Sequence, residues 1–104
     1  MSKYKLQIMS TAQADLKDIV DYIAVQLREP VVARKQLHRL KEAIFSLQEF
    51  PERHELVRDE VLALHGIRKL LVDKYLVFYA IQDSAKSVNI IRVLHSRRNW
   101  SDLL

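Results

Sequence analysis

The sequence predicts an α+β domain in which a two-helix antiparallel hairpin packs on one face of a β-sheet. Residues 3–9 alternate polar and apolar side chains, which is the period of a strand. Residues 12–47 carry apolar side chains at helical spacing, interrupted once near Pro30. From residue 67 onward, apolar runs alternate with short polar turns. One strand, two helices and then a three-stranded antiparallel meander are typical of an α+β layer structure.

The composition indicates one domain, residues 1–104, with a substantial core. Of its 104 residues 49% are apolar, and it has one glycine and two prolines. The absence of cysteine excludes disulfides and thiolate metal sites, so we expect a reducing, cytoplasmic setting. No apolar run approaches roughly 20 residues, so we expect neither a membrane span nor a signal peptide. The net charge of +4 suits an acidic protein partner or a nucleic acid, although ordinary soluble surfaces carry such a charge too.

The first strand and first helix follow directly from these patterns. Residues 3–9 predict a half-buried or edge strand, and Ser10 or Thr11 is expected to cap the helix that follows. That helix is predicted over residues 12–28. Its apolar stripe consists of Ala12, Leu16, Ile19, Ile23 and Leu27. The charged side chains Asp15, Lys17, Asp18 and Asp21 are predicted to lie largely off this stripe.

A second helix is predicted from about residue 30, because proline suits the first turn of a helix. Its buried stripe consists of Ala33, Leu37, Leu40, Ile44 and Leu47. Its outer face is basic and consists of Arg34, Lys35, His38, Arg39 and Lys41. The short connection predicts that the two helices form an antiparallel hairpin, which Phe50-Pro51 closes.

The second half of the chain predicts a loop and three strands. Residues 52–66 indicate a connecting loop with a short turn or strand at 61–64. Strands are predicted at 67–72, 75–81 and 88–94, the first two joined by a tight turn. The strand at 75–81 has no polar interruption, so we place it centrally, covered on both faces. The tail at 101–104 is expected to form at most one helical turn.

Cationic side chains follow the last predicted strand closely. His95, Arg97, Arg98 and Trp100 lie within six positions of its end. Strand alternation puts Arg92 on the face of Ile90 and Leu94, and Arg68 on the face of Leu70 and Val72. If the two arginines meet, they predict a groove for a phosphate or carboxylate. The alternative is that each arginine pairs with a nearby acid or reaches water.

Other candidate groups have a functional and a structural interpretation. His95 suits proton transfer near neutral pH, whereas histidines at strand ends more often serve structure. Tyr75 and Tyr79 share a face and either stack on a ligand or pack in the sheet. The remaining histidines have no metal-ligand spacing, and one glycine precludes a nucleotide loop. An enzyme with these residues would act without cofactor, by acid–base and electrostatic catalysis on a phosphodiester.

Four segments of the chain stand in a characteristic order and spacing. In the first predicted helix the segment is Asp-Leu-x-x-Ile-x-x-Tyr-Ile, from Asp15 to Ile23. In the predicted strands the segments are Ile-Arg-Lys-Leu-Leu-Val from Ile67, Tyr-Leu-Val-Phe-Tyr from Tyr75, and Ile-Ile-Arg-Val-Leu-His-Ser-Arg-Arg from Ile90. Together these segments resemble the RelE/ParE superfamily of bacterial type II toxins, and the resemblance covers nearly the whole chain.

The resemblance implies a toxin of a type II toxin–antitoxin (plasmid stabilisation) module, neutralised by a cognate antitoxin in a hetero-oligomer. ParE-like members poison DNA gyrase, whereas RelE-like members are mRNA interferases, which cleave mRNA on the ribosome. The strand ending in His95 resembles the ParE side more closely. RelE-like nucleases carry a catalytic Tyr, or His followed by Tyr, near the C-terminus. Here Ser96 follows His95, and Trp100 has no acidic hydroxyl.

The favoured hypothesis is therefore ParE-like inhibition of a topoisomerase, without enzymatic activity. The expected contact residues for target or antitoxin are Arg68, Tyr79, Arg92, His95, Arg97, Arg98 and Trp100. The alternative is a ribosome-dependent endonuclease, in which Arg68 and Arg92 hold phosphate and His95 transfers the proton. A third hypothesis is a non-toxic module that only binds the antitoxin. None of the three requires a metal or a cofactor.

Overall fold

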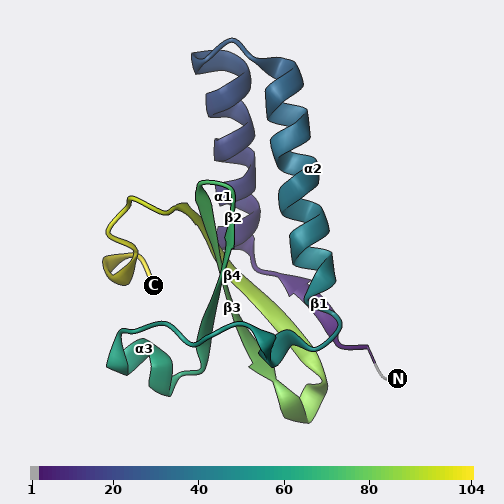
Figure 1. The fold of residues 1–104 in the computed structure, drawn as a ribbon, viewed down its shortest axis with the longest axis vertical. Coiled ribbons are helices and arrows are strands. Elements are labelled where there is room, and N and C mark those ends of the chain that lie inside the picture. Colours follow the sequence, from purple (N-terminus) through teal and green to yellow (C-terminus); the bar gives the residue numbers. More distant parts are fainter. Residues whose placement is uncertain (1–2) are drawn as a thin grey trace.

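The computed structural model describes residues 3–104 as one four-stranded sheet carrying a long helical hairpin (Figure 1). The strands are β1 (Lys5–Ile8), β2 (Ile67–Val72), β3 (Tyr75–Gln82) and β4 (Ser87–His95), in the spatial order β1-β4-β3-β2. The meander β2–β3–β4 is antiparallel, and β1 lies at the edge, parallel to β4. The predicted α+β class, the edge strand and the central position of β3 are therefore confirmed.

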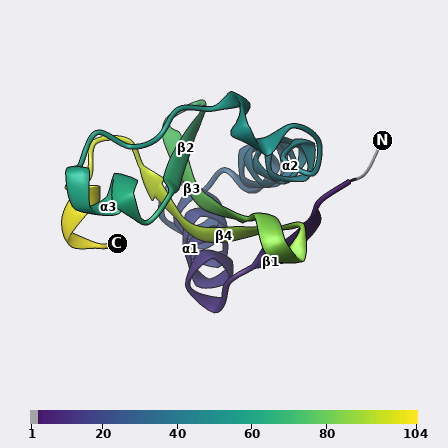
Figure 2. The same ribbon diagram turned by 90° about the horizontal axis from the view of Figure 1, so that it is seen from below.

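The helical hairpin consists of α1 (Ser10–Asp21), a π-helical turn η1 (Tyr22–Gln26) and α2 (Pro30–Ser46). Both helices contribute to one buried core with the sheet. Figure 2 shows α1, α2 and the strands from below. The helical part of this core consists of Ala12, Leu16, Leu40, Ile44 and Leu47, and the strand part of Val77, Tyr79, Val88, Ile90 and Val93. Helical and strand periodicity thus converge on one apolar layer, which confirms the predicted stripe of the second helix.

The start and end of the first helix differ from the prediction. Met9 is the N-cap, and no side chain caps the helix, so the predicted caps at Ser10 and Thr11 are wrong. The Thr11 hydroxyl instead donates a hydrogen bond of 2.8 Å to the carbonyl of Ile91. At the other end, the chain changes to the π-helical turn, and Leu27 is 51% exposed although it was predicted on the buried stripe.

The connection between the helices and the meander runs along the outer edge of β2, and its second half covers the opposite face of the sheet together with the C-terminus. The connection includes the 3-10 turn η2 (Pro51–Arg53) and a short helix α3 (Glu60–Leu64), where a turn or strand was predicted. The Asp59 carboxylate caps α3 by accepting a hydrogen bond from the Leu62 amide. A second apolar cluster forms here from Val57, Ile67, Phe78 and Leu94, with Trp100 and Leu103 packed against it. The helical turn η3 (Asp83–Ala85) connects β3 to β4, and the turn η4 (Trp100–Asp102) follows β4 near the C-terminus.

A β-bulge in β4 decides which side chains share a face. Phe78 pairs with Arg92, but the next residue, Tyr79, pairs with Ile90, so Ile91 is an extra residue. An extra residue inverts the alternation of every side chain that follows it. Ile90 and Val93 consequently lie in the hairpin-side core. The predicted grouping of Ile90, Arg92 and Leu94 on one face is therefore wrong.

Candidate functional site

The exit of β4 is held firmly by backbone hydrogen bonds. The Ser96 amide donates 2.8 Å to the carbonyl of Lys74, in the β2–β3 turn, and the Arg98 amide donates 3.0 Å to that of His95. Arg97 and Arg98 are exposed, and neither forms an ion pair with a side chain of residues 3–104. This turn, residues 96–98, is called the cationic turn; it presents two guanidinium groups, unpaired within residues 3–104, from a rigid support.

His95 packs against Tyr75, its partner across the sheet. The two rings meet edge to face with centroids 5.6 Å apart. His95 Nδ1 accepts a hydrogen bond of 3.1 Å from the Arg97 amide. The neutral imidazole then carries its proton on Nε2, which leaves one N–H donor for a ligand. His95 is therefore a positioned hydrogen-bonding group beside the two cations.

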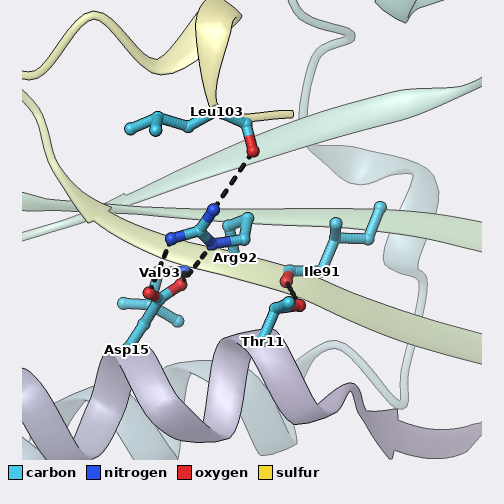
Figure 3. A network of polar contacts seen from close by, with 6 residues as sticks. All are labelled: Thr11, Asp15, Ile91, Arg92, Val93 and Leu103. Carbon is cyan, nitrogen blue, oxygen red and sulfur yellow. Dashed lines mark hydrogen bonds and ion pairs between the residues drawn. The ribbon is translucent and has the colours of Figure 1, made fainter.

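Arg92 is held by Asp15, a residue that the sequence stripe did not identify (Figure 3). Arg92 Nε and Nη2 donate 2.7 and 2.8 Å to the two Asp15 carboxylate oxygens, and Nη1 donates 3.1 Å to the Leu103 carbonyl. The same carboxylate accepts 2.9 Å from the Val93 amide on the edge of β4. The ion pair with Asp15 raises the pKa of Arg92. This cluster, the Asp15 clasp, joins α1, β4 and the C-terminal tail.

The prediction that Asp15 lies off the apolar stripe is wrong, since it is only 8% exposed. Ala12 and Asp15 are three positions apart, which puts them on the same helix face. A carboxylate at such a position, together with an arginine inside an apolar strand, was the available signal for a buried pair.

Arg68 lies apart from Arg92. Its Nη1 donates 2.6 Å to the carbonyl of His54 and 3.2 Å to that of Glu52. Arg68 pairs with Tyr79, whereas Arg92 pairs with Phe78, and neighbouring residues of a strand point to opposite faces. The two arginines therefore do not converge, and the anion-binding groove considered from the sequence does not form.

Two aromatic candidates belong to the packed interior. Tyr79 is 0% exposed, and its hydroxyl donates 2.6 Å to the carbonyl of Pro51. Burial raises the pKa of Tyr79 to about 12. Trp100 packs on Phe78 with ring centroids 5.1 Å apart. Tyr79 thus connects the sheet to the segment at Pro51, and Trp100 connects the C-terminal tail to the sheet. Tyr79 offers no surface to a partner in this conformation.

His54 gives the fold a testable dependence on pH. Its ring meets Tyr79 edge to face, Nε2 is buried without a hydrogen-bond partner, and burial followed by the charge of Arg53 lowers its pKa. The unfolded chain therefore binds this proton more readily, and stability falls as the pH drops below about 6.5. We expect His54→Phe to flatten this acid limb in urea titrations between pH 7 and 5. The same replacement of the exposed His65 serves as the control; an equal effect there would contradict the assignment.

The described residues include no group of three or more His, Cys, Asp or Glu side chains arranged to hold a metal ion. No helix among residues 3–104 has the length and apolarity of a membrane span. The candidate site consists of the cationic turn, His95 and the surfaces beside them.

Comparison with known proteins agrees with this architecture. Residues 6–100 match a family described as the ParE toxin of the type II toxin–antitoxin system parDE. The chain is 38% identical over 88 residues to Toxin RelE2 of Caulobacter vibrioides, covering 84% of this chain and 89% of that protein.

Two solved structures are similar in fold. The chromosomal ParDE TA system of P. aeruginosa superposes with a TM-score of 0.73 at 24% identity, covering 89% of this chain and 96% of the other. The toxin–antitoxin complex RelBE2 of Mycobacterium tuberculosis gives 0.65 at 25% identity, covering 89% and 98%. With a family match over nearly its whole length, the chain belongs to the ParE toxins of type II toxin–antitoxin systems, within the RelE/ParE superfamily.

Proposed function

We propose that this toxin arrests growth by binding and inhibiting DNA gyrase through protein contacts, and that a cognate antitoxin neutralises it. The observation that carries the proposal is the dispersal of the residues that RNA cleavage would need. Arg92 is held by Asp15, and Arg68 donates to two backbone carbonyls. His95 pairs with Tyr75, three positions from the Phe78–Arg92 pair, so alternation turns it to the other face of the sheet. Phosphodiester cleavage requires cations and a proton-transfer group around one phosphate.

The cationic turn supports a role in protein binding. Arg97 and Arg98 are exposed and unpaired within the described chain, and Lys74 is exposed in the β2–β3 turn to which Ser96 is bonded. Positive charges on such a surface speed the encounter with an acidic protein and fix its orientation. We assign the contact with the target to His95, Arg97 and Arg98.

Similarity to toxin–antitoxin systems supports a cognate antitoxin as a second partner of this chain. One similar structure is of a ParDE system and another is of the RelBE2 toxin–antitoxin complex. The expected assembly is a hetero-oligomer of this chain with its antitoxin.

The second candidate function is ribosome-dependent mRNA cleavage. It is favoured by the name RelE2 of the relative at 38% identity and by the N–H donor that His95 presents. In that mechanism His95 would transfer the proton, and we expect His95→Ala to slow cleavage by roughly 10²-fold or more.

Induction of the chain in cells separates the hypotheses. We expect growth arrest with DNA-damage signalling, together with inhibition of supercoiling by purified gyrase. Cleavage of transcripts in phase with codons, without an effect on supercoiling, would contradict gyrase inhibition and support the nuclease. Growth that continues unchanged would leave only a non-toxic, antitoxin-binding module.

Charge reversal tests the assigned contact. We expect Arg97→Glu/Arg98→Glu to weaken gyrase inhibition on the order of tenfold or more, because like charges across an interface are costly. The matched control is Arg34→Glu/Lys35→Glu, which makes the same charge change on exposed positions of α2. Equal losses in the two variants would mean that only net charge matters, and the contact would not lie at the cationic turn.

A further inference from the structure

A groove runs between the helical hairpin and the exit of β4. We call it the hairpin groove; its volume is about 730 Å³. Its apolar lining includes Ile19, Tyr22, Ile23, Leu27, Val32 and Tyr75. His95 and Arg98, which belong to the proposed target contact, line the same groove. The groove is thus continuous with the cationic turn.

Part of the apolar lining is exposed because the hairpin is longer than the sheet that it covers. Figure 1 shows α1 and α2 extending past the strands. The β2–β3 turn is joined to α2, because the Asp73 carboxylate accepts hydrogen bonds from Gln36 and Arg39. Tyr22, Leu27 and Val32 are 56%, 51% and 48% exposed. Val25 and Val31, at the tip, are exposed as well. Large apolar side chains gathered on an exposed surface mark an interaction site, and π-helical turns such as η1 recur at functional sites.

Opposite charges flank this apolar surface. On the helix side lies Asp18, which is exposed and has no ion pair within residues 3–104. On the strand side lie Lys74, His95 and Arg98. Asp73 adds little negative charge there, because both of its carboxylate oxygens accept bonds of 2.7 Å from Arg39. The groove therefore has one acidic edge and one basic edge.

We propose that the hairpin groove binds an amphipathic α-helix of the target protein, with an apolar stripe flanked on one side by carboxylates. The proposal rests on the proposed function, which it extends by naming the surface and the chemistry of the segment bound there. The carboxylates would face Lys74 and Arg98, and a basic residue on the other flank would face Asp18. This is the helix-in-groove mode, in which apolar anchors supply affinity and flanking charges set the orientation.

The dimensions suit a helix. From Asp15 to Leu27 the helical wall is roughly 18 Å long at 1.5 Å per residue, which matches about three turns of a partner helix. A membrane surface fits poorly, because the apolar side chains line a concave wall between two elements instead of a convex tip alone. Tyr22, Leu27 and Val32 provide exposed apolar side chains against which a second helix can pack.

Variants of the groove test the proposal with the full-length chain and purified gyrase. We expect Leu27→Glu and Val32→Glu each to weaken inhibition of supercoiling by tenfold or more, while circular dichroism shows an unchanged fold. Phe45→Glu is the matched control, since Phe45 is 55% exposed on α2 and outside the groove. Retained inhibition in the groove variants would overturn the proposal and leave gyrase inhibition standing.

Cross-linking identifies the bound segment. Benzoylphenylalanine at position 27 should cross-link to a helical, acidic segment of gyrase, and the same probe at position 45 should not. A cross-link confined to a strand or loop of gyrase would overturn the proposal that the bound segment is a helix. Variants that lose antitoxin binding but still inhibit gyrase would assign the groove to the antitoxin and overturn the proposal. A wild-type chain that does not inhibit gyrase would refute the proposed function and this extension together.

Discussion

Replacing Asp15 with alanine is expected to lower the free energy of unfolding by about 3 kcal/mol or more. The change leaves Arg92, whose side chain is only 20% exposed, without its carboxylate, and the Val93 amide without its acceptor. Removing one partner of a buried pair costs more than the pair contributes, because the remaining charge stays desolvated. For a domain of this size the melting temperature should fall by roughly 12 °C or more.

Urea titration and thermal unfolding measure this effect against two controls. Asp18→Ala removes an exposed carboxylate three positions further along α1 and should change stability by about 0.5 kcal/mol or less. Asp15→Ala/Arg92→Met should recover part of the loss, because no unpaired charge remains. If Asp15→Ala and Asp18→Ala unfold alike, the Asp15 clasp does not hold the fold together.

Raising the pH is expected to remove roughly 3 kcal/mol of stability through Tyr79 alone. The pKa of this buried phenol is raised to about 12 from an ordinary value near 10, so the folded chain holds the proton that the unfolded chain releases. The contribution is complete below pH 10 and is lost as the pH rises towards 12. Burial is the main cause, because an ionised phenolate in the hairpin-side core would lose its hydration.

Comparison with Tyr79→Phe isolates this contribution. The variant loses the 2.6 Å bond to the Pro51 carbonyl and should be about 1–2 kcal/mol less stable at neutral pH. Between pH 10 and 12 its stability should decline less than that of the wild type, so the two curves approach each other. Parallel curves over that range would show that Tyr79 ionises as easily in the folded chain as in the unfolded one.

Variants of Asp15 and of the cationic turn separate stability from activity. Asp15→Ala should reduce toxicity only as far as it reduces the folded population. Charge reversal at Arg97 and Arg98 should reduce toxicity in a chain that remains folded, because both side chains are exposed. Measuring both properties for each variant therefore distinguishes the support of the site from the site itself.

Much of the fold could be predicted from periodicity. The alternation near Tyr4 and the helical spacing that ends at Leu47 gave an edge strand and the hairpin, because each element must bury one apolar face. The short helix α3 was missed, because in five residues its period cannot be recognised. The positions of the helix caps were missed because Met9 passes directly from β1 into α1, leaving the Thr11 hydroxyl to bond with β4.

The sequence by itself determined the fold class, the toxin superfamily and the cationic turn after β4. Only the tertiary structure decided which cations are free. One bulge opposite Tyr79 puts Arg68 and Arg92 on opposite faces, and helix α1 brings Asp15 to Arg92 from 77 positions away. Periodicity is a local property that burial imposes on each element, whereas pairing register and long-range ion pairs depend on how the elements meet in space. Arg97 and Arg98 follow the last strand and meet no carboxylate from another element of residues 3–104, so they retain the exposure on which the proposed function depends.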